Sequence, residues 1–123
     1  MKDETRKAPD LPERTKQFAL GVIRLFSALP KTTEARVLGK QLLRSGTSVG
    51  ANYREAYRGR SKPEFISKIG DCLKELDETS YWLDLLGESG VVSKAKLSGL
   101  RDECEQLLAI FTTTAKKAKS NVS

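Results

Sequence analysis

The side chains able to carry chemistry in this chain of 123 residues are mainly carboxylates, arginines and lysines, because the sequence contains no histidine. Histidine is the commonest general base and the commonest metal ligand, so its absence removes most support for a hydrolase or a metal enzyme. Asp71, Glu75 and Glu78 share one helix face, as the carboxylates of a dimetal site do. Such sites also use Glu-x-x-His motifs, which this chain lacks. We therefore predict a protein that is not an enzyme and holds no metal, cofactor or small-molecule substrate.

Asn52 and Glu55 lie three residues apart on a predicted helix and form a second candidate pair. Without a histidine or a metal ligand, an acid–base role for this pair has no supporting group. We interpret Asn52 as a hydrogen-bonding residue of the core or of an interface. We interpret Glu55 as the ion-pair partner of a nearby arginine.

Basic side chains recur along one face of the predicted second helix and continue into the loop after it. This basic stripe comprises Arg36, Lys40, Arg44, Arg54, Arg58, Arg60 and Lys62. The net charge of +6 favours anionic partners, and a row of cations can follow nucleic-acid phosphates. The alternative is a solvated face, partly neutralised by Glu34, Glu55 and carboxylates of the next helix. If the stripe binds nucleic acid, we expect it to contact the phosphate backbone rather than base edges.

Two tyrosines adjoin this stripe, because Tyr53 precedes Arg54 and Tyr57 precedes Arg58. Tyrosines beside arginines can stack on nucleic-acid bases. Tyrosines at helical spacing more often bury one ring edge against a core. The sequence therefore favours burial of Tyr53 and Tyr57 over base stacking.

Four amphipathic helices are expected to position these residues, each with an apolar stripe repeating every three or four positions. Pro30 ends the first helix, and Ser61 followed by Pro63 and Glu64 marks the start of the third. The predicted ranges are about 12–29, 32–58, 61–87 and 93–118. Short connections between such helices predict an all-α, up-down-up-down antiparallel four-helix bundle. We assign residues 1–12 to a flexible arm, 13–118 to the bundle and 119–123 to a flexible basic tail.

The second helix contains residues that are weak helix formers. Gly46 and Gly50 share a face, and each costs about 1 kcal/mol relative to alanine in a helix interior. Small residues allow another backbone to approach, and Ser45 can hydrogen-bond across such a contact. We predict a tightly packed core here. Because the next turn centres near Arg60, we also predict that Glu75 meets Arg44 or Ser45.

Two cysteines, Cys72 and Cys104, fall inside apolar helical patterns and are predicted to be reduced core residues. The N-terminal residues lack the apolar segment of a secretory signal. No apolar run approaches the roughly 20 residues of a membrane-spanning helix. We therefore expect a cytoplasmic protein without membrane contact.

Several motifs together resemble a known family. They are Leu29-Pro30, Gln41-Leu42, the run from Ser48 to Tyr57, Ser61 with Glu64-Phe65, and Lys74-Glu75-Leu76. In this combination the chain resembles the bacterial four helix bundle protein family, also called the 23S rRNA-intervening sequence protein family. It departs from the family pattern at Gly46, where alanine is common, and at Ala56, where glycine commonly follows the motif glutamate.

The resemblance implies a left-handed antiparallel bundle assembled as a homopentamer. It also implies a family-motif polar network of Ser48, Asn52, Glu55 and Glu75. The residues compatible with an oligomer interface are Gly46, Gly50, Tyr53, Trp82 and Leu85. The family is similar to the accessory variability proteins of diversity-generating retroelements, which are basic pentamers that work with RNA and a reverse transcriptase. We therefore expect binding of nucleic acid, RNA more than DNA; the alternative is an oligomeric protein-interaction scaffold of unknown partner.

Overall fold

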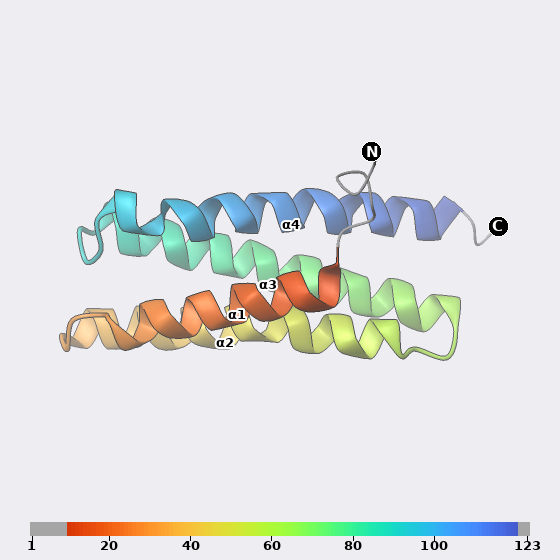
Figure 1. Cartoon of the computed structure of the whole chain (residues 1–123), viewed down its shortest axis with the longest axis horizontal. Coiled ribbons are helices and arrows are strands. Elements are labelled where there is room, and N and C mark those ends of the chain that lie inside the picture. Colours follow the sequence, from red (N-terminus) through yellow and green to blue (C-terminus); the bar gives the residue numbers. More distant parts are fainter. Residues whose placement is uncertain (1–9, 121–123) are drawn as a thin grey trace, which may run out of the picture.

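The computed structural model describes residues 10–120, and nearly all of them are helical. The helices are α1 (Leu11–Ser27), α2 (Thr33–Tyr57), α3 (Lys62–Glu88) and α4 (Lys94–Ser120). They lie alongside one another in a four-helix bundle, with the chain reversing direction at each connection (Figure 1). The predicted all-α fold is confirmed. The left-handed twist of the bundle stays a prediction.

Polar side chains define the starts of the first three helices. Asp10, Thr32 and Ser61 each accept a hydrogen bond from the backbone N–H three residues later. Such caps satisfy donors that the first turn of a helix leaves free. Glu64 accepts from the N–H of Arg60 at 2.8 Å, one residue before the position that a reciprocal capping box uses.

The helices extend two residues beyond the predicted bounds of the bundle at each end. The arm was predicted to reach residue 12, but α1 begins at Leu11, capped by Asp10. The tail was predicted to begin at residue 119, but α4 continues to Ser120. Residues 1–9 and 121–123, which make up the rest of the arm and tail, lie outside the described residues.

The contact between α2 and α3 contains a fully buried polar pair. The hydroxyl of Thr79 lies 2.9 Å from that of Ser45 and 2.8 Å from the carbonyl oxygen of Glu75. Both side chains are completely buried, so the hydrogen bond offsets the cost of removing them from water. Ser45 was predicted to hydrogen-bond across a packed contact, and this is confirmed. Its partner is Thr79 rather than Glu75, one helical turn further along α3.

Apolar residues from all four helices fill the rest of the interior. Leu42, Val49, Leu76 and Phe111 have no exposed surface. Both cysteines are buried and free, as predicted. Burial raises the pKa of each thiol to about 12.

The small residues of α2 face α1. A Cβ added to Gly46 would lie 2.8 Å from Cγ2 of Val22, and one added to Gly39 would lie 2.6 Å from Cδ1 of Leu29. A Cβ on Gly50 would lie 3.3 Å from the Thr15 hydroxyl. The predicted close packing is therefore present, and α1 is the element that approaches.

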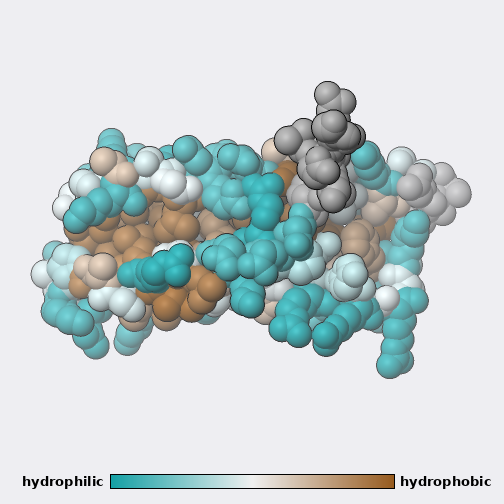
Figure 2. All heavy atoms as spheres, in the orientation of Figure 1, coloured by the Kyte–Doolittle hydropathy of each residue, from teal (hydrophilic) through white to brown (hydrophobic). Residues whose placement is uncertain are grey.

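Hydrophobic residues also reach the surface between α4 and α1. Figure 2 shows them gathered toward the end of the bundle where the α1–α2 and α3–α4 connections lie. Ile23 on α1 is 41% exposed, and Leu100 on α4 is half-buried beside Gly21. None of the four described helices has the length and apolar character needed to cross a membrane.

Candidate nucleic-acid interface

The basic stripe lies on the outer face of α2 and on the connection to α3. Arg36, Lys40 and Arg44 follow one another at intervals of four positions, and so do Arg54 and Arg58, which places the members of each group above one another on the helix. Every residue of the stripe is exposed. The opposite face of α2 carries the buried residues Leu42, Ser45, Gly46 and Val49.

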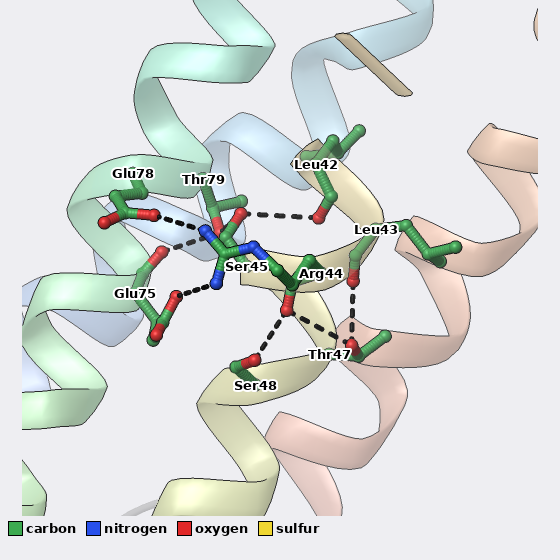
Figure 3. Close-up of polar contacts among 9 residues, drawn as sticks. All are labelled: Leu42, Leu43, Arg44, Ser45, Thr47, Ser48, Glu75, Glu78 and Thr79. Carbon is green, nitrogen blue, oxygen red and sulfur yellow. Dashed lines mark hydrogen bonds and ion pairs between the residues drawn. The ribbon is translucent and has the colours of Figure 1, made fainter. Parts of the chain in front are cut away.

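Arg44 is the stripe residue that pairs with carboxylates. Its guanidinium lies 3.0 Å from Oε1 of Glu78 and 3.9 Å from Oε1 of Glu75, both on α3 (Figure 3). The predicted meeting of Arg44 with Glu75 is therefore confirmed, although Glu78 is closer. Within residues 10–120, no other side chain of the stripe has a carboxylate oxygen within 4.0 Å.

Two of the carboxylates expected to neutralise the stripe, those of Glu55 and Glu34, form no ion pair with its residues. Glu55 binds Lys68 of α3, with 2.6 Å between Oε1 and Nζ, rather than the predicted arginine. Glu34 makes no ion pair with any residue the structure describes. Partial neutralisation by carboxylates of α3 is therefore present at Arg44, and the other cations of the stripe are exposed without an ion pair among residues 10–120.

Of the three other arginines among residues 10–120, Arg14 and Arg101 form ion pairs between helices and Arg24 forms none. Arg14 of α1 donates two hydrogen bonds to Glu103 of α4, at 2.9 and 2.7 Å. These hydrogen bonds raise the pKa of the Arg14 guanidinium. Arg101 of α4 pairs with Asp84 of α3. The basic residues of the stripe, apart from Arg44, have no such role in holding helices together.

Two hollows flank the C-terminal part of the stripe. One, of about 660 Å³, lies at the α2–α3 connection and includes Arg60 and Lys68 in its wall. The other, of about 630 Å³, lies between α1 and α2 and includes Tyr53 and Tyr57. The residues that line both hollows are Ala51, Arg54 and Arg58. These three therefore form a ridge between two concave surfaces.

The two tyrosines have different environments. The ring of Tyr53 is half-buried, with its centroid 5.5 Å from that of Phe111 on α4, and burial raises the pKa of its hydroxyl. Tyr57 is 71% exposed and contacts Tyr53 at a centroid distance of 6.2 Å. The prediction of burial is confirmed for Tyr53 and wrong for Tyr57.

The four residues of the expected family-motif network are not hydrogen-bonded to one another within the described part of the chain. The Ser48 hydroxyl donates to the carbonyl of Arg44 in its own helix, at 2.6 Å. Glu55 pairs with Lys68 and Glu75 lies near Arg44. No hydrogen bond of the Asn52 side chain is present among residues 10–120, and this side chain is half-buried rather than core.

Glu75 has the least favourable environment of these carboxylates. Burial, and then the nearby charge of Glu78, raise the pKa of its carboxyl group. Its Oε1 is buried without a hydrogen-bond donor among the described residues, and Arg44 stays 3.9 Å away. Asp71 lies 3.9 Å from Lys68 of its own helix, so the carboxylates of this face that pair with α2 are Glu75 and Glu78.

The oligomer-interface candidates divide into two groups. One group packs within the chain: Gly46 and Gly50 lie against α1, and Tyr53 packs against Phe111 of α4. Their residue types are thus explained without a second copy of the chain. Trp82 and Leu85 are half-buried on α3, and the indole N–H of Trp82 is buried without an acceptor among the described residues.

Comparison with known proteins identifies the family. The profile of the family described as 23S rRNA-intervening sequence protein matches residues 10–113. The chain belongs to the 23S rRNA-intervening sequence protein family. The family resemblance inferred from the sequence motifs is therefore confirmed over almost all of the described bundle. No curated protein matches the sequence.

A solved structure supports this membership of the 23S rRNA-intervening sequence protein family. It is the crystal structure of a protein with unknown function from the S23 ribosomal protein family of Bacteroides thetaiotaomicron VPI-5482. The two chains are 32% identical, with a TM-score of 0.81. The match covers 86% of this chain and 98% of the other.

Proposed function

We propose that this protein binds the phosphate backbone of nucleic acid through the basic stripe and has no catalytic activity. The observation that carries the proposal is the exposed row of cations on α2 and the connection after it, in two groups that run from Arg36 to Arg44 and from Arg54 to Lys62. Within residues 10–120, all of its members except Arg44 lack carboxylate partners. In contrast, Arg14 and Arg101 are committed to ion pairs between helices.

Uncompensated surface cations raise the electrostatic free energy of a folded protein that already carries a net charge of +6. A polyanion removes this repulsion and gains the entropy of the counterions that it releases. The binding therefore depends on charge and on the spacing of phosphates more than on base sequence. The family name refers to ribosomal RNA, and on that likeness we propose RNA in preference to DNA.

We also propose that the chain acts as a homo-oligomer, for which the family resemblance implies a pentamer. Two surfaces support self-association. One is the apolar surface between α1 and α4 (Figure 2). The other comprises the half-buried Trp82 and Leu85 on α3. Repetition of the stripe around an assembly would multiply the phosphate contacts available to one nucleic acid.

The test is binding of labelled single-stranded RNA and duplex DNA over a salt series. Arg36→Gln, Lys40→Gln and Arg58→Gln remove one charge each from the stripe. Arg24→Gln on α1 and Lys96→Gln on α4 remove one charge each from exposed positions elsewhere. The proposal expects weaker binding from the stripe variants and little change from the matched controls.

Equal losses from stripe and control variants would show binding by net charge alone and overturn the assignment to the stripe. No binding at low salt by a correctly assembled protein would overturn the proposal as a whole. The apolar surface of Figure 2 would then favour the second candidate, an oligomeric protein-interaction scaffold.

A further inference from the structure

We propose that the C-terminal end of α2 is a site for single-stranded nucleic acid, in which Tyr57 stacks on an unpaired base and Arg54 and Arg58 hold adjacent phosphates. The inference rests on the proposed function and adds to it the class of ligand. Its starting point is the exposure of Tyr57, which leaves 71% of its surface in contact with solvent.

Tyr57 is supported from the core by a series of aromatic rings. Phe111 is completely buried, Tyr53 packs against it at 5.5 Å, and Tyr57 lies 6.2 Å from Tyr53. The inner side of Tyr57 therefore contacts a ring that is itself fixed by the core. A ring held in place from one side and exposed on the other loses little conformational entropy when a base stacks on it.

Two positively charged arginines lie next to this ring, as binding to the phosphates of a nucleic-acid strand requires. The dipeptide Tyr-Arg occurs twice, at 53–54 and at 57–58, so two arginines lie about 6 Å apart along the helix axis. Neither arginine has a carboxylate partner among the described residues. Cations spaced along one helix face beside an aromatic ring combine backbone attraction with base stacking.

The two hollows give the strand room on both sides of this ridge. A base on Tyr57 would occupy the hollow of about 630 Å³ between α1 and α2. The backbone would cross Arg54 and Arg58 into the hollow of about 660 Å³, where Arg60 adds positive charge. Ala51 keeps the ridge low, because its side chain ends at Cβ.

The carboxylates that line these hollows are already engaged. Glu55 binds Lys68, and Glu64 accepts from the N–H of Arg60. Asp10 accepts from the N–H of Glu13, whose carboxylate in turn accepts from Gln17. Their hydrogen bonds and ion pairs reduce the repulsion that a phosphate would meet.

Stacking on Tyr57 requires a base whose face is free. In a duplex, the neighbouring base pairs cover both faces of each base, so only the phosphates would reach this site. An unpaired strand offers its bases and its phosphates together. The site should therefore prefer single-stranded RNA or single-stranded DNA over a duplex.

The experiment measures the binding of five labelled probes: a short single-stranded RNA, the DNA strand of the same sequence, the duplex counterpart of each, and a strand of abasic nucleotides. The variants are Tyr57→Ala and Tyr57→Phe. Tyr81→Ala is the matched control, because Tyr81 is also exposed, at 56%, but lies on α3 outside the stripe. Thermal unfolding of each variant checks that the bundle is intact.

We expect Tyr57→Ala to weaken binding of the single strands about 5- to 100-fold. Tyr57→Phe keeps a stacking ring and should bind like the wild type, as should Tyr81→Ala. The abasic and duplex probes should bind Tyr57→Ala and the wild type equally. Comparison of the RNA and DNA strands shows whether the site uses the ribose hydroxyl.

Unchanged binding of single strands by Tyr57→Ala would overturn the inference and leave the proposed function standing. An equal loss on abasic and normal strands would also overturn it, because the ring would then act through the fold. If the wild type binds none of the probes at low salt, the proposed function itself fails.

Discussion

The two faces of α2 differ in burial and in charge. The inner face carries Ser45, Gly46 and Val49, which are buried against α1 and α3. The outer face carries Arg54 and Arg58, which are exposed and make no ion pair among the described residues. The inner face is made of residues that let other helices approach, and the outer face of residues that repel one another. We infer that stability and binding are separated across this single helix.

The largest expected effect tests this separation with two residues two positions apart. Leu42→Ala should lower the free energy of unfolding by about 2–5 kcal/mol, because Leu42 is completely buried. Lys40→Ala on the exposed face should change it by less than about 0.5 kcal/mol. Chemical denaturation of both variants measures the difference. Similar losses from the two variants would break the comparison.

The same change, glycine to alanine, should have opposite effects on stability at a packed and at an open position. Gly46→Ala places a Cβ 2.8 Å from Val22, a buried β-branched residue with little rotamer freedom. Overpacking costs about 1–3 kcal/mol, and the higher helix propensity of alanine stabilises by about 1 kcal/mol. We therefore expect Gly46→Ala to lower the free energy of unfolding. Gly70→Ala on α3 meets nothing within 4 Å and should stabilise the protein by up to about 1 kcal/mol. Thermal unfolding should thus shift in opposite directions, and a stabilising Gly46→Ala would contradict the packing described here.

The buried thiols give a pH-dependent test of the inner side of the bundle. Folding raises the pKa of Cys72 and Cys104 from about 9 to about 12. Above pH 9 the unfolded chain loses thiol protons that the folded chain keeps, so stability falls as pH rises toward 12. The limiting slope is about 1.4 kcal/mol per thiol per pH unit. A Cys72→Ala/Cys104→Ala variant should show a shallower decline between pH 9 and 11, and an unchanged decline would mean that the thiols are accessible.

The smallest expected effect lies on α3, at Glu75, whose carboxylate is 3.9 Å from the Arg44 guanidinium of α2. Its pKa is raised mainly by burial, so the folded protein holds this proton more tightly than the unfolded chain does. Stability contributed by the protonated group therefore falls as pH rises from the ordinary glutamate pKa through the raised value. Glu75→Gln removes the carboxyl group and with it this fall in stability with rising pH. Because Arg44 already offers a partial counter-charge, the variant should be as stable as the wild type at pH 7 or more stable by less than about 1 kcal/mol. A marked destabilisation would show that the pair with Arg44 matters more than burial.

Periodicity and capping residues were enough to predict the helices, the reduced cysteines and the exposed stripe. Ser61 and Pro63 marked the start of α3, and the heptad spacing of α2 placed Leu42, Ser45 and Val49 in the core. These features depend on local backbone geometry and on one helix face. Such information is present in a short stretch of sequence.

Contacts between helices were predictable only to within one helical turn. A turn centred near Arg60 led to Glu75 as the partner of Ser45, but the actual partner is Thr79. Gly46 indicated a close neighbour, but not that this neighbour is the side chain of Val22 on α1. Tyr53 and Tyr57 have equivalent spacing, yet only Tyr53 is within reach of Phe111, which depends on how α4 is placed.

The most direct test of the central claim is the salt dependence of binding to single-stranded RNA, compared between the wild type, Arg54→Gln/Arg58→Gln and Arg24→Gln. Each phosphate contact to a single strand contributes about 0.7 to the slope of log K against log salt. The account predicts that the slope of the double variant falls by about 1.4, while that of Arg24→Gln stays at the wild-type value. An unchanged slope in the double variant would contradict the assignment of phosphate contacts to the outer face of α2.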